Sequence, residues 1–143
     1  MKAEWSAFKA RLAGHTITAG KVFPLVRKTG DTTVRDNYIV AKSHPPDRLD
    51  DGRLAGSQRP DSDQRYTYDV RIITTAADGL DIWADAVFAQ LLGHKLMVPG
   101  RRCTPVELVQ NVEEGDGYDR VSDLFWRDLS FRFWSRRAPK ETP

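Results

Sequence analysis

The sequence predicts an α+β fold, in which two helices pack on one face of a mainly antiparallel sheet of four or five strands. Apolar residues recur at helical spacing in segments 3–13 and 79–94. They alternate with polar residues in segments 66–74 and 123–137, which is typical of half-buried strands. The resulting order of helix, strands, helix, strands indicates an α+β domain.

The first helix is expected over residues 3–13. Trp5, Phe8 and Leu12 recur on one side of it, and charged residues flank them. Gly14 follows as a natural end point.

Two apolar runs come next, KVFPLV at residues 21–26 and NYIVAK at 37–42, and both favour strands. Gly30 and Asp31 between them have turn chemistry. The second run has apolar side chains on both faces, with Tyr38, Val40 and Lys42 on one and Ile39 and Ala41 on the other.

A long polar stretch, residues 43–65, follows the second run and has almost nothing to bury. Compact domains rarely join strands by a structureless loop of roughly twenty residues unless it is functional or disordered. Its aspartates suggest calcium, but their spacing does not fit the EF-hand pattern and arginines are interleaved with them. A solvated loop is therefore favoured over a metal site.

The strand at 66–74 leads into the most hydrophobic segment, the helix expected over 79–94. Asp78 is expected to cap this helix, and Gly93 to end it. Its apolar stripe should lie on the sheet and comprises Leu80, Trp83, Val87 and Leu91.

Residues 95–114 are expected to form one or two strands broken by prolines, before a glycine-containing turn at 114–119. The final strand, within 123–137, places Phe125, Leu129, Phe131 and Phe133 on one face. Trp126 and Trp134 fall on the other face, which should be wet. Exposed aromatics of this kind suggest a partner surface, although a loop folded over them explains the pattern equally well.

No catalytic, cofactor-binding or metal site is expected. His15, His44 and His94 are not spaced to share one helical face. No histidine stands at a position that suggests a catalytic pair with Cys103. The 22 basic and 20 acidic residues give a net charge of +2, too even to indicate a nucleic-acid binder. The N-terminus lacks a signal-peptide core and no window suits a membrane span, so we expect a soluble protein, made in the cytosol, without a membrane partner.

The order of these segments resembles the tail terminator (tail completion) proteins of long-tailed bacteriophages, particularly those of actinobacterial phages. The resemblance covers about residues 35 to 137. It is carried by the strand Tyr66 to Thr74 passing into an alanine-rich helix, by the PGRRC turn after that helix, and by the closing aromatic strand DLFWRDLSFRFWSRR.

The resemblance implies a structural virion protein rather than an enzyme. The family forms a hexameric ring that caps the tail tube, stops tube polymerisation and meets the head–tail connector protein. The implied partners are further copies of the chain, the tail-tube protein and that connector. Phage DNA would pass through the ring without sequence-specific binding. The implied location is the head-proximal end of the virion tail, with the host cytoplasm during assembly.

This role gives residues 43–65 a use as an assembly loop within a single domain of residues 1–137, followed by a flexible tail at 138–143. A tolerated surface insertion is the other interpretation. A head–tail connector or neck protein is an alternative function, and a small hydrolase or nucleic-acid enzyme is a third. The residues expected at interfaces are Arg48, Asp50, Asp51, Arg53, Arg59, Asp61, Asp63, Trp126 and Trp134.

Overall fold

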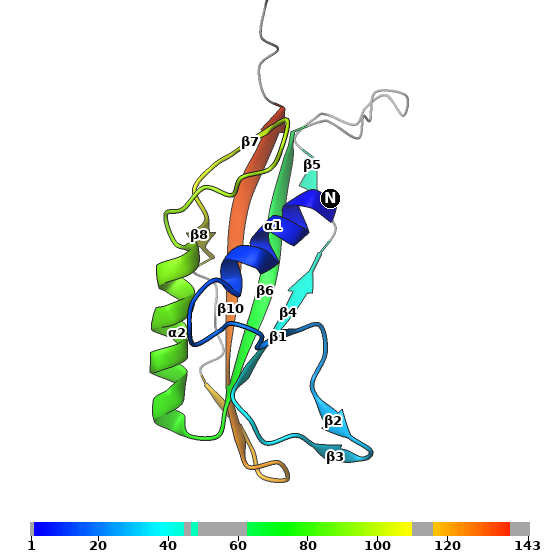
Figure 1. Cartoon of the computed structure of the whole chain (residues 1–143), viewed down its shortest axis with the longest axis vertical. Coiled ribbons are helices and arrows are strands. Elements are labelled where there is room, and N and C mark those ends of the chain that lie inside the picture. The colour runs from blue at the N-terminus through cyan, green and yellow to red at the C-terminus, as the bar shows by residue number, and fades with distance from the viewer. Residues whose placement is uncertain (1, 45–46, 49–62, 110–115, 138–143) are drawn as a thin grey trace, which may run out of the picture.

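The computed structural model describes residues 2–44, 47–48, 63–109 and 116–137, and it has two layers (Figure 1). The helices α1 (Lys2–Leu12) and α2 (Ala77–Leu91) form one layer. The other is a mainly antiparallel sheet whose central order is β1-β4-β6-β10-β7. The predicted α+β class is confirmed.

The sheet is five strand positions wide, but several positions are filled by short strands. Three of these, β7, β8 and β9, share one edge of β10, and β5 continues the line of β4 along β6. The strands of this sheet are β1 (Val22–Phe23), β4 (Tyr38–Ser43), β5 (Asp47–Arg48), β6 (Gln64–Thr74), β7 (Arg101–Cys103), β8 (Glu107–Leu108), β9 (Gly117–Asp119) and β10 (Leu124–Arg137).

The pairing of β6 with β10 sets the two faces of the sheet. These strands run antiparallel in unbroken register from Gln64 opposite Ser135 to Thr74 opposite Phe125. Because side chains alternate along each strand, one set faces the helices and the other faces away. The set facing the helices forms the main core with Phe8, Leu12 and the predicted stripe of α2, and its largest members are Tyr66, Tyr68, Ile72, Phe131 and Phe133.

A buried polar cluster attaches α1 to the sheet. Glu4, which the sequence places among the flanking charges of the helix, is only 4% exposed. Ser135 donates a hydrogen bond to Glu4 at 3.0 Å, and Arg101 donates to Ser135 at 2.9 Å. Burial raises the pKa of Glu4, but hydrogen bonds to its carboxylate, including that from Ser135, outweigh this and leave the pKa below its ordinary value.

The run at 21–26 differs from its prediction, because only Val22–Phe23 forms a strand. This strand pairs parallel with β4, and Leu25 beyond it is 71% exposed. Pro24 has no N–H for a ladder, so the strand ends there. The expected turn is present as a small separate hairpin of β2 (Lys28–Thr29) and β3 (Thr32–Thr33), with Gly30 at a φ of +61°.

The start of α2 also differs from its prediction. Asp78 does not cap the helix; Ala76 is the N-cap and makes no side-chain capping bond. The Thr74 hydroxyl instead donates to the Ala76 carbonyl at 2.7 Å. The end of the helix is as predicted, since Gly93 follows with a φ of +75°, the left-handed conformation that glycine favours.

The turn predicted at 114–119 is wrong for Gly117–Asp119, which form strand β9, while 114–115 lie outside the described residues and a turn follows at 120–123. Asp123, with a φ of +56°, supplies the positive φ expected of a glycine. Gly117 has another use, since a Cβ atom there would lie 2.0 Å from Cε2 of Trp126. Only glycine leaves room for this indole.

The predicted loop at 43–65 is shorter than expected at both ends. Strand β4 includes Ser43, β5 occupies Asp47–Arg48, and β6 begins at Gln64 rather than at Tyr66. The predicted interface residues Asp50, Asp51, Arg53, Arg59 and Asp61 lie outside the described residues, as does the predicted tail at 138–143.

Candidate assembly surface

The face of the sheet turned away from α1 and α2 combines aromatic, charged and apolar side chains. We call it the helix-free face. Neighbouring strands place its residues in rows, because β4, β6 and β10 keep one register throughout. Its central members are Val40, Lys42, Arg65, Asp69, Arg71, Ile73, Trp126, Asp128, Ser130, Arg132 and Trp134.

The end of this face nearest β7 combines an indole with guanidinium groups. Arg65 lies over the ring of Trp134, with 5.4 Å from its Cζ to the ring centroid. Arg132 donates to Glu107 of β8 at 2.9 Å. Trp134 is fixed from its backbone, since its N–H donates to the Thr104 hydroxyl at 2.9 Å. Tryptophan and arginine side chains are enriched at the centres of interfaces.

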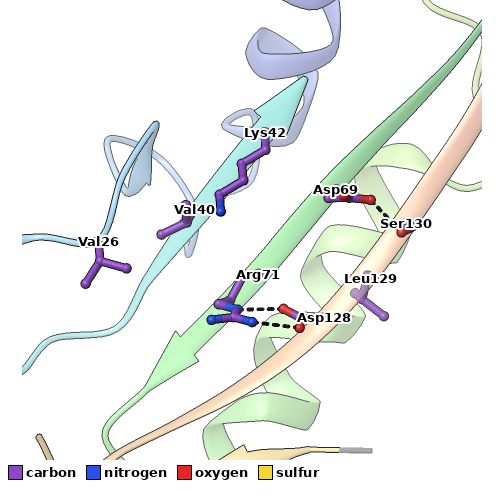
Figure 2. Close-up of a pocket in the computed structure, with 8 residues that line it drawn as sticks. All are labelled: Val26, Val40, Lys42, Asp69, Arg71, Asp128, Leu129 and Ser130. Carbon is purple, nitrogen blue, oxygen red and sulfur yellow. Dashed lines mark hydrogen bonds and ion pairs between the residues drawn. The ribbon is translucent and has the colours of Figure 1, made fainter. Parts of the chain in front are cut away.

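The middle of the face is a row of paired charges around a shallow groove of about 230 Å³ (Figure 2). Arg71 holds Asp128 with two bonds of 2.7 and 2.9 Å, from Nε and a terminal nitrogen. Both side chains are more than a third exposed, so this pair contributes little to folding stability. Its geometry leaves a fixed pattern of charge on the surface.

Beside this pair lie three groups that invite an enzymatic interpretation, His44, Asp69 and Ser130. His44 Nε2 contacts one oxygen of the Asp69 carboxylate, and the Ser130 hydroxyl donates to the other at 2.6 Å. A nucleophilic serine needs a histidine base next to its hydroxyl, with the acid behind the histidine. Here the acid lies between the serine and the histidine, so the three groups do not form a nucleophile–base pair.

The opposite end of the face is apolar. Tyr38, Val40, Ile73 and Leu124 form a second small core, against which Phe23 and Trp126 pack. The segment before β4 and the β9–β10 hairpin flank it and leave a groove of about 300 Å³, whose rim includes Val26 and Tyr118. These rim residues are 43% and 47% exposed, respectively.

The predicted interface tryptophans are therefore on one face but at different ends of it. Trp126 is half-buried between Gly117 and Arg71, whose Cζ lies 5.4 Å from the indole centroid. Eight positions of β10 separate it from Trp134, which at about 3.4 Å per residue is roughly 27 Å. Trp126 packs against the second small core and lines the adjoining groove, and its place in an interface stays a prediction.

Of the charged residues predicted at interfaces, the structure describes few. Asp63 is half-buried just before β6, and the backbone of Arg48 pairs with that of Gln64. The sequence interpretation did not select Arg65, Arg71 or Asp128. Their alternation with apolar residues was the available signal, but the pairing of Arg71 with Asp128 depends on the strand register.

The described residues include no group of three or more histidine, cysteine, aspartate or glutamate side chains that could hold a metal ion. Within the same residues, neither helix is long and apolar enough to cross a membrane. Cys103 is free and buried, and burial raises the pKa of its thiol.

Comparisons with known proteins give structural matches only. No protein-family model and no curated protein matches the sequence. One similar solved structure is a chain of the virion of a native gene transfer agent (GTA) particle, with a TM-score of 0.65 and 18% identity over 94% of this chain and 95% of that chain. A second, which carries no descriptive name, gives a TM-score of 0.54 and 16% identity over 96% and 89%. The protein thus shares its fold, over nearly the whole chain, with a component of a virion particle.

Proposed function

We propose that the protein is a structural component of a phage-like virion, and specifically the tail terminator that closes the tail tube with a ring of six copies. The observation that carries the proposal is the structural match to the GTA virion chain, because it extends over nearly the full length of both chains.

The helix-free face supports a role in binding other proteins. It offers an aromatic and arginine-rich end, a middle of fixed ion pairs and an apolar groove. Such a mixture is typical of protein interfaces, in which aromatic residues and arginine are enriched. Its serine, aspartate and histidine are not arranged for nucleophilic catalysis.

Deletion of the gene from its phage tests the proposal. Without a terminator, tube polymerisation continues, so electron micrographs should show abnormally long tails without attached heads. Supplying the wild-type chain from a plasmid should restore normal tails. Tails of normal length that fail to join heads would instead indicate the head–tail connector or neck protein.

Binding assays separate the same alternatives without a phage. The purified chain should retain the tail-tube protein in a pull-down and leave the portal and its adaptor in solution. Retention of the portal or adaptor alone would contradict the terminator role and favour the connector.

A further inference from the structure

Four arginines surround Trp134 at the end of the helix-free face nearest β7. Arg65 and Arg132 lie beside it, and Arg102 and Arg136 form the next row. The neighbouring pair Cys103 and Ser135 is buried toward the helices, so Arg102 and Arg136 point to the helix-free face, where both are exposed. We call these five residues the Trp134 patch.

Within the patch, Arg102 and Arg136 are direct partners in the β7–β10 ladder. Like charges directly opposite each other on neighbouring antiparallel strands destabilise a sheet. Arg132 has Glu107 as a partner, but neither Arg102 nor Arg136 has an acidic partner among the described residues. An acidic group supplied by another molecule would remove this repulsion.

The chain itself carries a matching acidic surface on the outer side of α2. The helix has three aspartates, Asp78, Asp81 and Asp85, all exposed, and no basic residue. Asp81 is already paired within the chain, since Arg127 of β10 lies 3.0 Å from its carboxylate. Among the aspartates lies Ile82, which is 57% exposed. The inner side of α2 is buried in the core, so this outer face points away from the sheet.

The two surfaces lie on opposite sides of the molecule, since α2 covers one face of the sheet and the Trp134 patch lies on the other. A contact between them therefore joins the front of one copy to the back of the next. Such a contact uses two different surfaces, and it closes into a ring when the rotation between copies allows it.

Charge also sets the register of this contact. The helix directly behind the patch is α1, whose Glu4 bonds to Ser135, and its exposed charges Lys2 and Lys9 are basic. Arginines facing these lysines would repel them. A diagonal offset toward the first half of α2 replaces the lysines with Asp78 and Asp85, on either side of the paired Asp81, and brings Ile82 toward the indole of Trp134.

We propose that the Trp134 patch of one copy binds the acidic outer face of α2 in the next copy, and that this contact joins the copies of the ring. The inference rests on the proposed function for the ring itself, and it adds which surfaces meet. The contact has an apolar centre, Ile82 on Trp134, within a rim of opposite charges, as expected of a specific interface.

Charge reversal tests the pairing. Arg102→Glu with Arg136→Glu, and separately Asp78→Lys with Asp85→Lys, should each weaken self-association by roughly tenfold or more, since facing like charges oppose binding. All four sites are exposed, so thermal melts of the arginine reversal should match the wild type. The aspartate reversal should melt slightly lower but stay folded, because Asp78 lies in the first turn of α2, where the helix dipole favours an acidic side chain. A 1:1 mixture of the two variants should restore assembly, because every contact in an alternating ring then joins opposite charges. Light scattering measures all three.

Cross-linking tests the geometry. Chains carrying Arg136→Cys together with Asp78→Cys, Asp81→Cys or Asp85→Cys should form a ladder of oligomers with a short thiol cross-linker. Each single-cysteine variant should stay monomeric, because each contact then holds only one engineered thiol, and random collisions can give no more than a dimer. The native Cys103 is buried and should not react. The same reaction on isolated tails applies if the free chain is a monomer.

The outcomes separate this contact from the ring. Self-association unaffected by either reversal, or the absence of a ladder from every cysteine pair, would overturn the contact while leaving the ring intact. A chain that assembles neither free nor on tails would overturn the ring as well. If the arginine reversal abolishes a DNA mobility shift but leaves assembly unchanged, the patch serves DNA and the proposal is wrong.

Discussion

Replacing Gly117 by alanine should selectively damage the end of the sheet that holds Trp126. The new Cβ atom would lie 2.0, 2.1 and 2.5 Å from Cε2, Cζ2 and Nε1 of the indole. Ordinary carbon contacts are about 3.5 to 4.0 Å, so the ring must retreat by roughly 1.5 Å. Arg71 lies over the indole and limits that movement. We expect a loss of about 1 to 3 kcal/mol from overpacking, or detachment of β9 from β10.

Urea unfolding of four chains measures this effect: wild type, Gly117→Ala, Trp126→Ala and the double variant. In a thermal melt of a domain of this size, a loss of about 1 kcal/mol would lower the Tm by roughly 2 to 4 °C. Removing the indole removes the clash, so Gly117→Ala should cost almost nothing in the Trp126→Ala background. Equal destabilisation in both backgrounds, or a Gly117→Ala chain as stable as the wild type, would refute the close packing of Gly117 on this ring.

Four further results are expected. Phe131→Ala should cost about 3 to 5 kcal/mol in urea unfolding, because this fully buried ring packs between the helices and the sheet; an unchanged midpoint would contradict the assigned faces. Tyr68→Phe should leave stability equal or higher, by up to roughly 1 kcal/mol, because the buried Tyr68 hydroxyl has no hydrogen-bond partner in the described structure. Burial raises the pKa of Tyr66 to about 12. The contribution of Tyr66 to folding stability should therefore be complete below a pH of about 10, where unfolded tyrosine ionises, and should be lost as the pH rises through 12. Melting temperatures that stay constant over this pH window would disprove it. Deleting Leu49 to Ser62 and bridging with a glycine–serine turn should leave a folded chain that no longer assembles, whereas a folded chain that still caps tails would reduce the segment to a tolerated insertion.

The elements that the sequence predicts best are those whose apolar period is long and clear. In β6 and β10, alternation continues over many residues, so faces and core members such as Tyr66 and Phe133 follow directly. In α2, the apolar stripe and the glycine after the last turn can likewise be recognised from the segment's own sequence. Residues within one segment carry all of that information.

The predictions that were wrong depend on contacts between segments. Asp78 has the right chemistry for a helix cap, but the helix begins at Ala77, one residue before it. The Thr74 hydroxyl donates a hydrogen bond to the Ala76 carbonyl at this end of the helix. Gly117 suggests a turn by composition, and its actual constraint is an indole nine residues away. Glu4 resembles a surface charge until Arg101 and Ser135 are placed beside it.

The candidate surface was predictable only in part. Alternation places Trp126 and Trp134 on one face, but it does not show that the first packs against a small apolar core and the second lies among arginines. The Trp134 patch draws residues from β6, β7 and β10, and the opposition of Arg102 to Arg136 is a property of strand register alone. No local pattern contains that information.

The central position of β10 also has a consequence for the time course of folding. This strand is the last described element, yet β6, β7, β8 and β9 all pair with it, and Gln64 finds its partner only at Ser135. During synthesis, β6 therefore waits on the ribosome with one edge unpaired, an arrangement that invites association with other nascent chains. Such non-local pairing is slow, in the range of milliseconds to seconds for comparable topologies. Chaperone demand should accordingly peak just before residues 124–137 emerge.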